Sequence, residues 1–351
     1  MEPIREFSSL DDDTIRREVI GSERPAVLRG LVNRWPAVDV GRHSPAALVQ
    51  YLRGLDNGNP VDAIMTPPEV AGRVFYNETM TGFNFVRNRL PITAIAEQVL
   101  RYCSFARAPA VAVQSALIRD CVPAFTADNH LTLMDAAVLP RIWLGNAITT
   151  PTHLDEWNNI GCVVAGRRRF TLFPPQQIAN LYIGPLDFAP TGAPMSLVSL
   201  RDPDFGRFPR FKEALAVAIT AELGPGDAIF IPPLWWHHVE SLEPFNLLVN
   251  YWWRAAANSA AATATTGTAT TATESAFDSL IHAILNLRSL PPATRQAWGA
   301  LFEHYVFGAQ ATAVQHIPAN RHGILGKILP ADVERLRAYL AEHLQTGKQP
   351  L

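Results

Sequence analysis

Residues 150–156, with the sequence TPTHLDE, bring a histidine and an aspartate close together. On an extended chain, residues i and i+2 point to the same face, so His153 and Asp155 can converge on one point while Leu154 turns into the packing. An imidazole and a carboxylate at this spacing offer two ligands to a metal ion and leave room for a third ligand. The segment therefore predicts part of a metal site.

A third ligand is available in residues 224–240, with the sequence GPGDAIFIPPLWWHHVE. Gly-Pro-Gly-Asp predicts a tight turn that starts a buried strand, and Pro232 and Pro233 end that strand. His237 follows among tryptophans, which would hold it rigidly. Two histidines and one carboxylate with open positions are typical of non-haem Fe(II) oxygenases. The same donors can hold Zn(II), so ligand type alone leaves the metal open.

Each of these residues also has an ordinary structural interpretation. A single His-x-Asp occurs by chance in many chains, and His153 could simply bond to Asp155. His237 could be a core histidine packed on its tryptophan neighbours. The combination, within a β-rich region, favours a metal site. In a strand His237 and His238 face opposite ways, so only one of them can be the ligand.

The elements that must position these side chains are short strands. Apolar or alternating runs, punctuated by Pro and Gly, recur at residues 141–145, 159–164, 169–173, 227–231 and 247–253. Regularly spaced short strands predict a sandwich or barrel, which we place at about residues 106–253. The part before it, about residues 1–105, mixes helices with short strands, and we take residues 1–253 as one domain.

The remaining chain has two parts of different composition. Residues 254–275 are almost entirely small residues rich in Ala and Thr, which predicts a linker or surface loop. Residues 276–351 show three apolar helical faces, with Pro residues at helix starts. These helices could pack on the sandwich or on a second copy, and a homodimer through this segment is a hypothesis.

The composition of the chain excludes some classes of binding partner. The 351 residues are 48% hydrophobic, and 30 Lys and Arg stand against 32 Asp and Glu, so the sequence provides no basic field for nucleic acid. The three cysteines, Cys103, Cys121 and Cys162, are scattered as in a reduced protein. No N-terminal signal-peptide core and no membrane-spanning apolar run occur. We therefore expect a soluble, cytoplasmic protein with no nucleic-acid or membrane partner.

Several motifs in order, over about residues 20–253, resemble one family, the cupin-like, JmjC-related 2-oxoglutarate oxygenases. Within that family they are most similar to the asparaginyl hydroxylase that inhibits hypoxia-inducible factor. The motifs are RPAVLRG at 24–30, WPA at 35–37, TPTHLDE at 150–156, GRRRFTLFPP at 166–175, FGRFP at 205–209, GPGD at 224–227, WWHHVESL at 235–242 and VNYW at 249–252. The resemblance implies a mainly β fold: a double-stranded β-helix, or jelly roll, with flanking N-terminal helices and a C-terminal helical segment.

The resemblance also implies roles for individual residues. The Fe(II) ligands would be His153, Asp155 and His237, which makes His237 the ligand and turns His238 away. The far carboxylate of the co-substrate 2-oxoglutarate would be bound by Thr150 and by Arg168, which stands where the family has Lys. An arginine can grip a carboxylate in two places. Arg167 or Arg169 would take this part if the register slipped by one. The cofactor pocket would also be lined by Asn159, Asn250 and Trp252.

One departure from the family concerns Ala112, which stands where the relatives present a Tyr to the co-substrate. Gln114 and Trp235 are expected to face the substrate. The resemblance implies an oxygenase that hydroxylates a protein or peptide side chain and releases succinate and CO2. Two alternatives stay open: a jelly-roll metalloenzyme acting on a small molecule without 2-oxoglutarate, and a non-enzymatic cupin-like binding protein. Lysine demethylation is less favoured, because the chain has no chromatin-reading module or zinc-binding Cys cluster.

Overall fold

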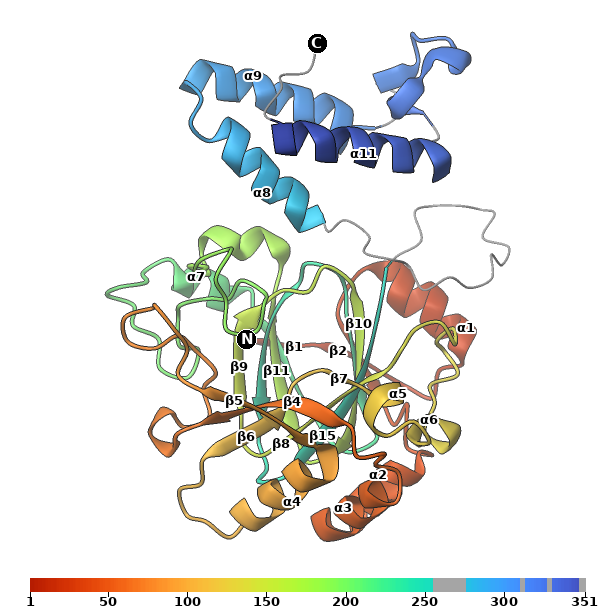
Figure 1. Ribbon diagram of the computed structural model, residues 1–351, viewed down its shortest axis with the longest axis vertical. Coiled ribbons are helices and arrows are strands. Elements are labelled where there is room, and N and C mark those ends of the chain that lie inside the picture. The colour runs from red at the N-terminus through yellow and green to blue at the C-terminus, as the bar shows by residue number, and fades with distance from the viewer. Residues whose placement is uncertain (255–275, 310–312, 327–329, 347–351) are drawn as a thin grey trace. The chain divides into compact units, whose positions relative to one another are not determined.

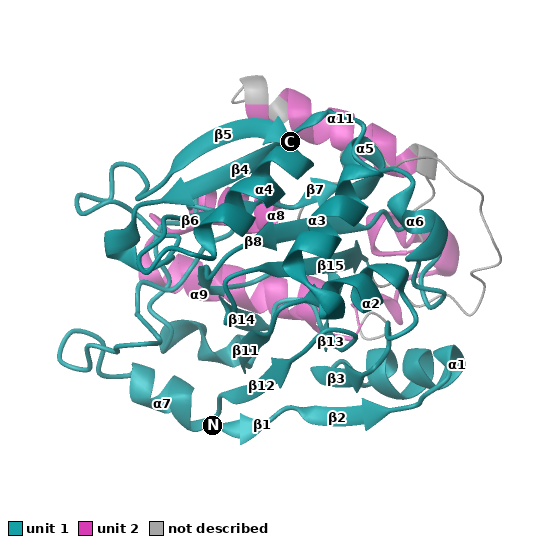
Figure 2. Ribbon diagram, turned by 90° about the horizontal axis from the view of Figure 1, so that it is seen from below, with its two compact units in different colours: residues 1–271 teal, residues 272–351 magenta. Residues whose placement is uncertain are grey.

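The computed structural model describes residues 1–254, 276–309, 313–326 and 330–346. The chain divides into two compact units, residues 1–271 and 272–351, which Figure 2 colours separately. The Ala/Thr-rich segment predicted at 254–275 lies almost wholly outside the described residues. None of the helices in the described part of the chain is long and apolar enough to cross a membrane.

Two β-sheets form the first unit (Figure 1). The five-stranded sheet has, in spatial order, β1 (Glu2–Pro3), β12 (Ile219–Leu223), β11 (Arg168–Phe173), β14 (Trp236–Ser241) and β9 (Thr149–His153). The ten-stranded sheet has β2 (Arg5–Ser8), β3 (Ala26–Arg29), β13 (Ala228–Ile231), β10 (Asn158–Ala165), β15 (Asn246–Trp253), β8 (Arg141–Gly145), β6 (Ala110–Val113), β4 (Pro60–Thr66) and β5 (Val86–Pro91), with β7 (Ala116–Leu117) beside β8. The expected jelly roll with flanking helices is confirmed.

The N-terminal part of the chain widens the larger sheet at both ends. Strands β2 and β3 join one end, where Leu28 lies opposite Ala228, and β4 and β5 form the other end. The helices of the first unit are α1 (Asp12–Thr14), α2 (Pro36–His43), α3 (Pro45–Arg53), α4 (Ile92–Tyr102), α5 (Ile118–Cys121), α6 (Phe125–Asp128) and α7 (Phe211–Ala216). Helices α2, α3 and α4 lie together over one face of the ten-stranded sheet (Figure 1).

Strand β10 is buried along its whole length because it packs on both faces. Ile160 and Cys162 contribute to the large core under the helices. Val163 belongs to a second core between the two sheets, together with Phe170 and Leu172 of β11. The alternation of the strand thus separates a helix-facing side from an interior side. The candidate site lies on the interior side.

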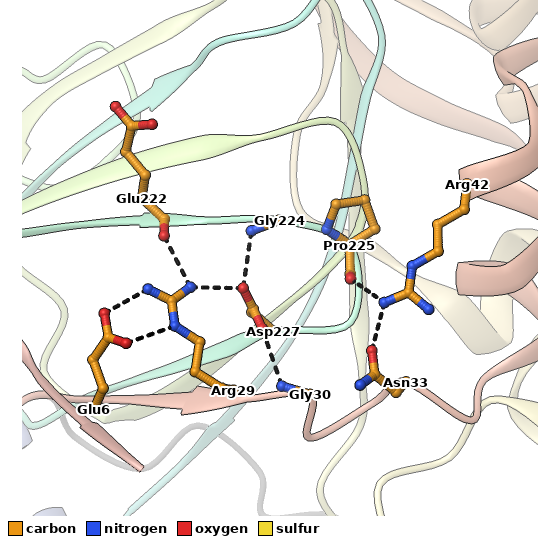
Figure 3. Close-up of polar contacts among 9 residues, drawn as sticks. All are labelled: Glu6, Arg29, Gly30, Asn33, Arg42, Glu222, Gly224, Pro225 and Asp227. Atoms are coloured by element: carbon orange, nitrogen blue, oxygen red, sulfur yellow. Dashed lines mark hydrogen bonds and ion pairs between the residues drawn. The ribbon is translucent and has the colours of Figure 1, made fainter. Parts of the chain in front are cut away.

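The Gly-Pro-Gly-Asp turn before β13 is tied to β3 by the Asp227 carboxylate (Figure 3). Its oxygens accept hydrogen bonds from the backbone N–H of Gly30 at 3.0 Å and of Gly224 at 3.1 Å, and from Arg29 at 2.7 Å. Gly226 has φ +100°, and a Cβ there would lie 2.0 Å from the side-chain oxygen of Asn33. The turn therefore requires glycine, and it fixes the start of a strand that lines the site.

The second unit contains α8 (Ala276–Leu287), α9 (Pro292–Phe302) and α11 (Pro330–Thr346). Its described residues expose many large apolar side chains. Leu285 is 73% exposed and Phe307 is 72% exposed, whereas Ala313 is buried. The described part of this unit therefore leaves much of its apolar surface uncovered.

Candidate metal centre

Three donor side chains converge at one end of the five-stranded sheet. His153 is the last residue of β9, Asp155 follows it, and His237 is the second residue of β14. One donor atom from each residue lies within 4.8 Å of the other two. Nε2 of His237 lies 3.5 Å from Oδ2 of Asp155. Two imidazoles and one carboxylate at this separation are suited to a divalent transition metal.

A β-bulge in β9 sets which side chains face the interior. His153 pairs with His237 and Thr150 pairs with Val239, so Pro151 and Thr152 together oppose a single residue of β14. Proline cannot donate a ladder hydrogen bond and is tolerated at bulges. The bulge allows Thr150 and His153, three residues apart, to line the same cavity.

Backbone carbonyls orient both imidazole rings. Nδ1 of His153 lies 2.8 Å from the carbonyl oxygen of Pro151, and Nδ1 of His237 lies 3.0 Å from that of Trp235. In the tautomer that donates from Nδ1, the lone pair of Nε2 is left for a metal. Burial, together with the neighbouring His237, lowers the pKa of His153 from 6.5 to about 4. His153 is therefore neutral at physiological pH, as a metal ligand must be.

A chain of hydrogen bonds fixes the Asp155 carboxylate. Its Oδ2 accepts from Nδ2 of Asn159 at 3.1 Å and from the Trp252 indole N–H at 3.2 Å. Asn250 donates to Oδ1 of Asn159 at 3.2 Å, and the Trp143 indole donates to Oδ1 of Asn250 at 2.8 Å. Outer partners of this kind hold a ligating carboxylate in one orientation.

The donors open into a small interior cavity of about 120 Å³ between the two sheets. Eight residues predicted for the metal and co-substrate line it: Thr150, His153, Asp155, Asn159, Arg168, His237, Asn250 and Trp252. They come from β9, β10, β11, β14 and β15 and from the turn after β9, so the fold brings them together from across the sequence. Their roles stay predictions, although the cavity gives them a common location.

Arg168 brings a buried positive charge into this cavity. It is only 7% exposed, and within the described residues its Nε has no hydrogen-bond partner and its guanidinium no carboxylate within 4 Å. Burial lowers its pKa to about 10, so it stays protonated at neutral pH. Its sequence neighbours differ: Arg167 and Arg169 lie on the outer surface and pair with Glu222. Of the three arginines, Arg168 alone lines the cavity.

The remaining predicted residues lie outside the cavity lining. Gln114 follows β6, where its backbone N–H donates to the Asp62 carbonyl at 3.0 Å. Trp235 packs against the core between the sheets. Their substrate roles stay predictions. Ala112 is buried in a small cluster with Ile64 and does not line the cavity.

His238 is buried on β14 and does not line the cavity. Its Nδ1 has no hydrogen-bond partner in the described part of the chain. Burial lowers its pKa to about 3.

Sequence reasoning missed part of the cavity wall. Trp143 lines the cavity and donates to Asn250. The alternation of residues 141–145 would have placed it opposite Ile142 and Leu144, which enter the core under the helices. Thr191 and Ala193 reach the cavity from an irregular segment, where no periodic pattern gives a signal.

Comparison with known proteins decides the family. A family model described as "Cupin-like domain" matches residues 12–259, well over half of the chain. The chain belongs to the cupin-like domain family. Curated relatives include a lysine-specific demethylase and a JmjC domain-containing protein, which agrees with the cupin-like, JmjC-related family that the motifs resemble.

Curated relatives match about a third of the chain. Human HSPB1-associated protein 1 is 37% identical over 113 residues, which cover 32% of this chain and 22% of that protein. The lysine-specific demethylase JMJ31 of Arabidopsis thaliana is 35% identical over 127 residues, 35% of this chain and 23% of that protein. The JmjC domain-containing protein F of Dictyostelium discoideum is 32% identical over 130 residues, 34% and 27% of the two chains. The matches thus span about a quarter of each relative.

Replacement of one donor tests the metal site. His153→Ala is expected to weaken Fe(II) or Mn(II) binding at least tenfold. Loss of a residue that only hydrogen-bonds to a metal ligand already lowers metal affinity about 10- to 100-fold, and loss of the ligand itself should cost more. Anaerobic calorimetric titration measures the affinity. His43→Ala, which removes an exposed imidazole outside the cavity, is the matched control and should bind normally. Unchanged affinity in His153→Ala would remove this residue from the ligand set.

The depressed pKa values predict how the metal-free protein responds to acid. The unfolded chain protonates each histidine near pH 6.5, whereas folded His153 and His238 resist protonation down to about pH 4 and about pH 3. Above pH 6.5 these two histidines therefore cost the folded protein nothing. As the pH decreases below 6.5, protonation favours the unfolded chain and the free energy of unfolding falls. Between pH 7 and pH 5 the expected loss is about 2 kcal/mol for each histidine.

Urea unfolding of the metal-free protein at the two pH values measures this loss. His238→Gln should show a clearly smaller loss, and the exposed-site variant His43→Gln the same loss as the wild type. Equal urea midpoints at pH 7 and pH 5 would contradict the prediction.

Proposed function

We propose that this protein is an Fe(II)- and 2-oxoglutarate-dependent oxygenase that hydroxylates a side chain of a protein or peptide. The observation that carries the proposal is the pairing of two unlike features in one cavity. A cluster of two imidazoles and a carboxylate suits a metal, and a buried guanidinium that pairs with no carboxylate among the described residues suits a carboxylate ligand. A jelly-roll binding protein would need neither of them at this place.

The donor set fits iron, and the rest of the cavity fits a dicarboxylate. His153, Asp155 and His237 would hold Fe(II), and Arg168 with Thr150 would hold the far carboxylate of 2-oxoglutarate. When bound, Fe(II) and 2-oxoglutarate would supply the oxidising chemistry, in which O2 is consumed and 2-oxoglutarate is converted to succinate and CO2. The iron assignment over zinc rests on the family and on this arginine, because the donor types suit both metals.

The chain's own residues would position the reactants and exclude water. Asn159 and Trp252 keep the Asp155 carboxylate in one orientation through bonds of 3.1 and 3.2 Å. The imidazole Nδ1 atoms are engaged by backbone carbonyls, so neither ring can rotate freely. Apolar residues from both sheets, including Phe170 and Ile229, line the cavity and keep it dry. In a dry cavity the attraction between Arg168 and a carboxylate is stronger than in water.

A polypeptide substrate is the finer part of the proposal. It is supported by the family resemblance and by the names of relatives, one of which is an HSPB1-associated protein and another a lysine-specific demethylase. Those names describe those proteins, and the chain matches only about a quarter of each. Mass spectrometry of treated peptides separates the two reactions, because hydroxylation adds an oxygen and demethylation removes a methyl group.

The co-substrate half is tested at Arg168. Arg168→Met removes the charge while keeping an apolar side chain of suitable length, so the protein is expected to fold. The loss of charge-assisted hydrogen bonds, about 1.5–3 kcal/mol, should weaken 2-oxoglutarate binding about 10- to 150-fold. Calorimetry on the Mn(II)-loaded protein measures the affinity, and succinate release with Fe(II) measures turnover.

Two further variants sharpen this test. Arg168→Lys should recover part of the affinity, because it restores the charge without the two-pronged grip. Arg167→Met removes a neighbouring surface arginine and should bind as the wild type does. If the wild type neither binds 2-oxoglutarate nor forms succinate, the oxygenase proposal fails, and a metalloenzyme or binding protein without this co-substrate takes its place.

We further propose that residues 276–346 form a homodimer interface. Large apolar side chains stay exposed on the described helices of this unit, among them Leu285, Trp298 and Phe307. A surface of that kind marks an association site. Light scattering after size exclusion should give twice the monomer mass, and Leu285→Glu with Phe307→Glu should halve it. A monomeric wild type would refute the interface.

A further inference from the structure

A second, larger cavity lies outside the candidate metal centre. Its volume is about 640 Å³, and its wall combines residues 67–84 with Leu197 and Arg207. Phe75, Tyr76 and Leu197 give it an apolar surface, and Arg73 and Arg207 bring two positive charges to it. None of the residues assigned to the metal or the co-substrate lines this cavity.

Arg73 is half-buried, and no protein anion accompanies it. Its guanidinium carbon lies 3.6 Å from the ring centroid of Phe75, and one of its N–H groups donates to the Leu197 carbonyl at 3.4 Å. Within the described residues no carboxylate lies within ion-pair distance of it. Burial lowers its pKa, which records the cost of removing this charge from water. A guanidinium held over an aromatic ring keeps its N–H groups available for a carboxylate ligand.

Arg207 adds a second unpaired charge to the same wall. Its guanidinium lies 5.0 Å from the ring centroid of Phe208, which is a buried residue. Glu78 also lines the cavity, but among the described residues it forms no ion pair with either arginine. The cavity therefore has an excess of positive charge next to apolar and aromatic surface.

One asparagine holds the backbone that presents Arg73, and a second holds the loop that follows. Asn84 accepts from the N–H of Phe75 at 2.9 Å and donates to the carbonyl of Arg73 at 2.8 Å. Oδ1 of Asn77 accepts from the N–H of Thr81 at 3.1 Å and of Gly82 at 3.2 Å. Arg73 is thus fixed before any ligand arrives, which reduces the entropic cost of binding.

The second cavity and the candidate metal centre share the β9 edge of the five-stranded sheet. Arg73 forms a β-bridge to Thr149, and Met195 forms one to His153. Ala193 lines the metal cavity, and Leu197 lines the second cavity. Four residues of extended chain span about 13 Å. One polypeptide could therefore reach both places with a few intervening residues.

We propose that this second cavity binds an acidic side chain, next to an apolar one, in the polypeptide substrate, a few residues from the residue that is modified. That this polypeptide is the substrate rests on the proposed function, whereas the binding site itself is inferred from the cavity and its two arginines. Glutamate or aspartate supplies the carboxylate for the guanidinium groups, and the apolar neighbour covers Phe75 and Leu197. The site would select sequence around the target residue.

The test uses NMR of the arginine Nε–H groups in the full-length, metal-free protein, with the Arg73 signal identified by its loss in Arg73→Lys. The probes are the dipeptide N-acetyl-Phe-Glu-amide and its neutral counterpart N-acetyl-Phe-Gln-amide. The glutamate probe should shift the Arg73 and Arg207 signals saturably, and the glutamine probe should bind at least tenfold more weakly. Arg207→Gln should weaken the glutamate probe at least tenfold with an unchanged melting temperature, since this side chain is exposed.

Arg201→Gln is the matched control, because Arg201 is an exposed arginine outside this cavity, and it should change the affinity less than twofold. Equal binding of both dipeptides, no saturable shift, or an equal loss in Arg201→Gln would overturn the proposal. Tighter binding of inorganic phosphate or succinate would also overturn it, by assigning the cavity to a free anion. Because no metal or turnover enters this experiment, its failure is distinct from failure of the oxygenase proposal.

Discussion

A full positive charge inside a β-sandwich is costly, and Arg168 carries one with no carboxylate of the described residues paired to it. Removing an unpaired ion from water costs several kcal/mol even after relaxation. The surrounding core, with Phe170 and Leu172 on the same strand, must supply that energy through apolar burial. The sandwich is therefore stable in spite of Arg168, and a bound carboxylate would offset the desolvation cost of this charge. The buried charge thus lowers the stability of the unliganded fold, and it becomes favourable only when a carboxylate ligand is bound.

The same cavity also holds an aspartate, yet the two opposite charges do not pair. Asp155 is engaged by Asn159 and Trp252, and Arg168 lies beyond ion-pair distance from it. Separation keeps both charges available, one for a cation and one for an anion. A direct ion pair between them would neutralise the cavity and leave it with little affinity for either. The hydrogen-bond chain from Trp143 through Asn250 keeps the aspartate on its own side.

Local patterns in the sequence predicted the pair His153 and Asp155 and five strands of the sandwich, because i and i+2 spacing and short alternating runs depend only on neighbouring residues. The choice of His237 over His238 came from the family resemblance. The runs at 141–145 and 227–231 match β8 and β13 within a residue. Other features depend on distant pairing. The contribution of β3 to the large sheet rests on Leu28 meeting Ala228, two hundred residues away. Thr191 enters the cavity from an irregular segment, and Trp143 acts through Asn250 on another strand. No local rule could have placed Thr191, and strand alternation places Trp143 on the interior side without showing its bond to Asn250.

The bulge at Pro151 and Thr152 makes the site sensitive to the length of β9 in a way that substitutions do not reveal. Side chains on a strand alternate, so one residue more or less exchanges the inner and outer faces of everything on one side of the change. With the bulge, Thr150 and His153 both face inward. Without it, regular pairing would keep only one of them in the cavity. Deletion of one of the two bulge residues would keep Thr150 and His153 in the sequence. It would nevertheless turn one of them out of the cavity, so that the co-substrate and metal sites would no longer share it.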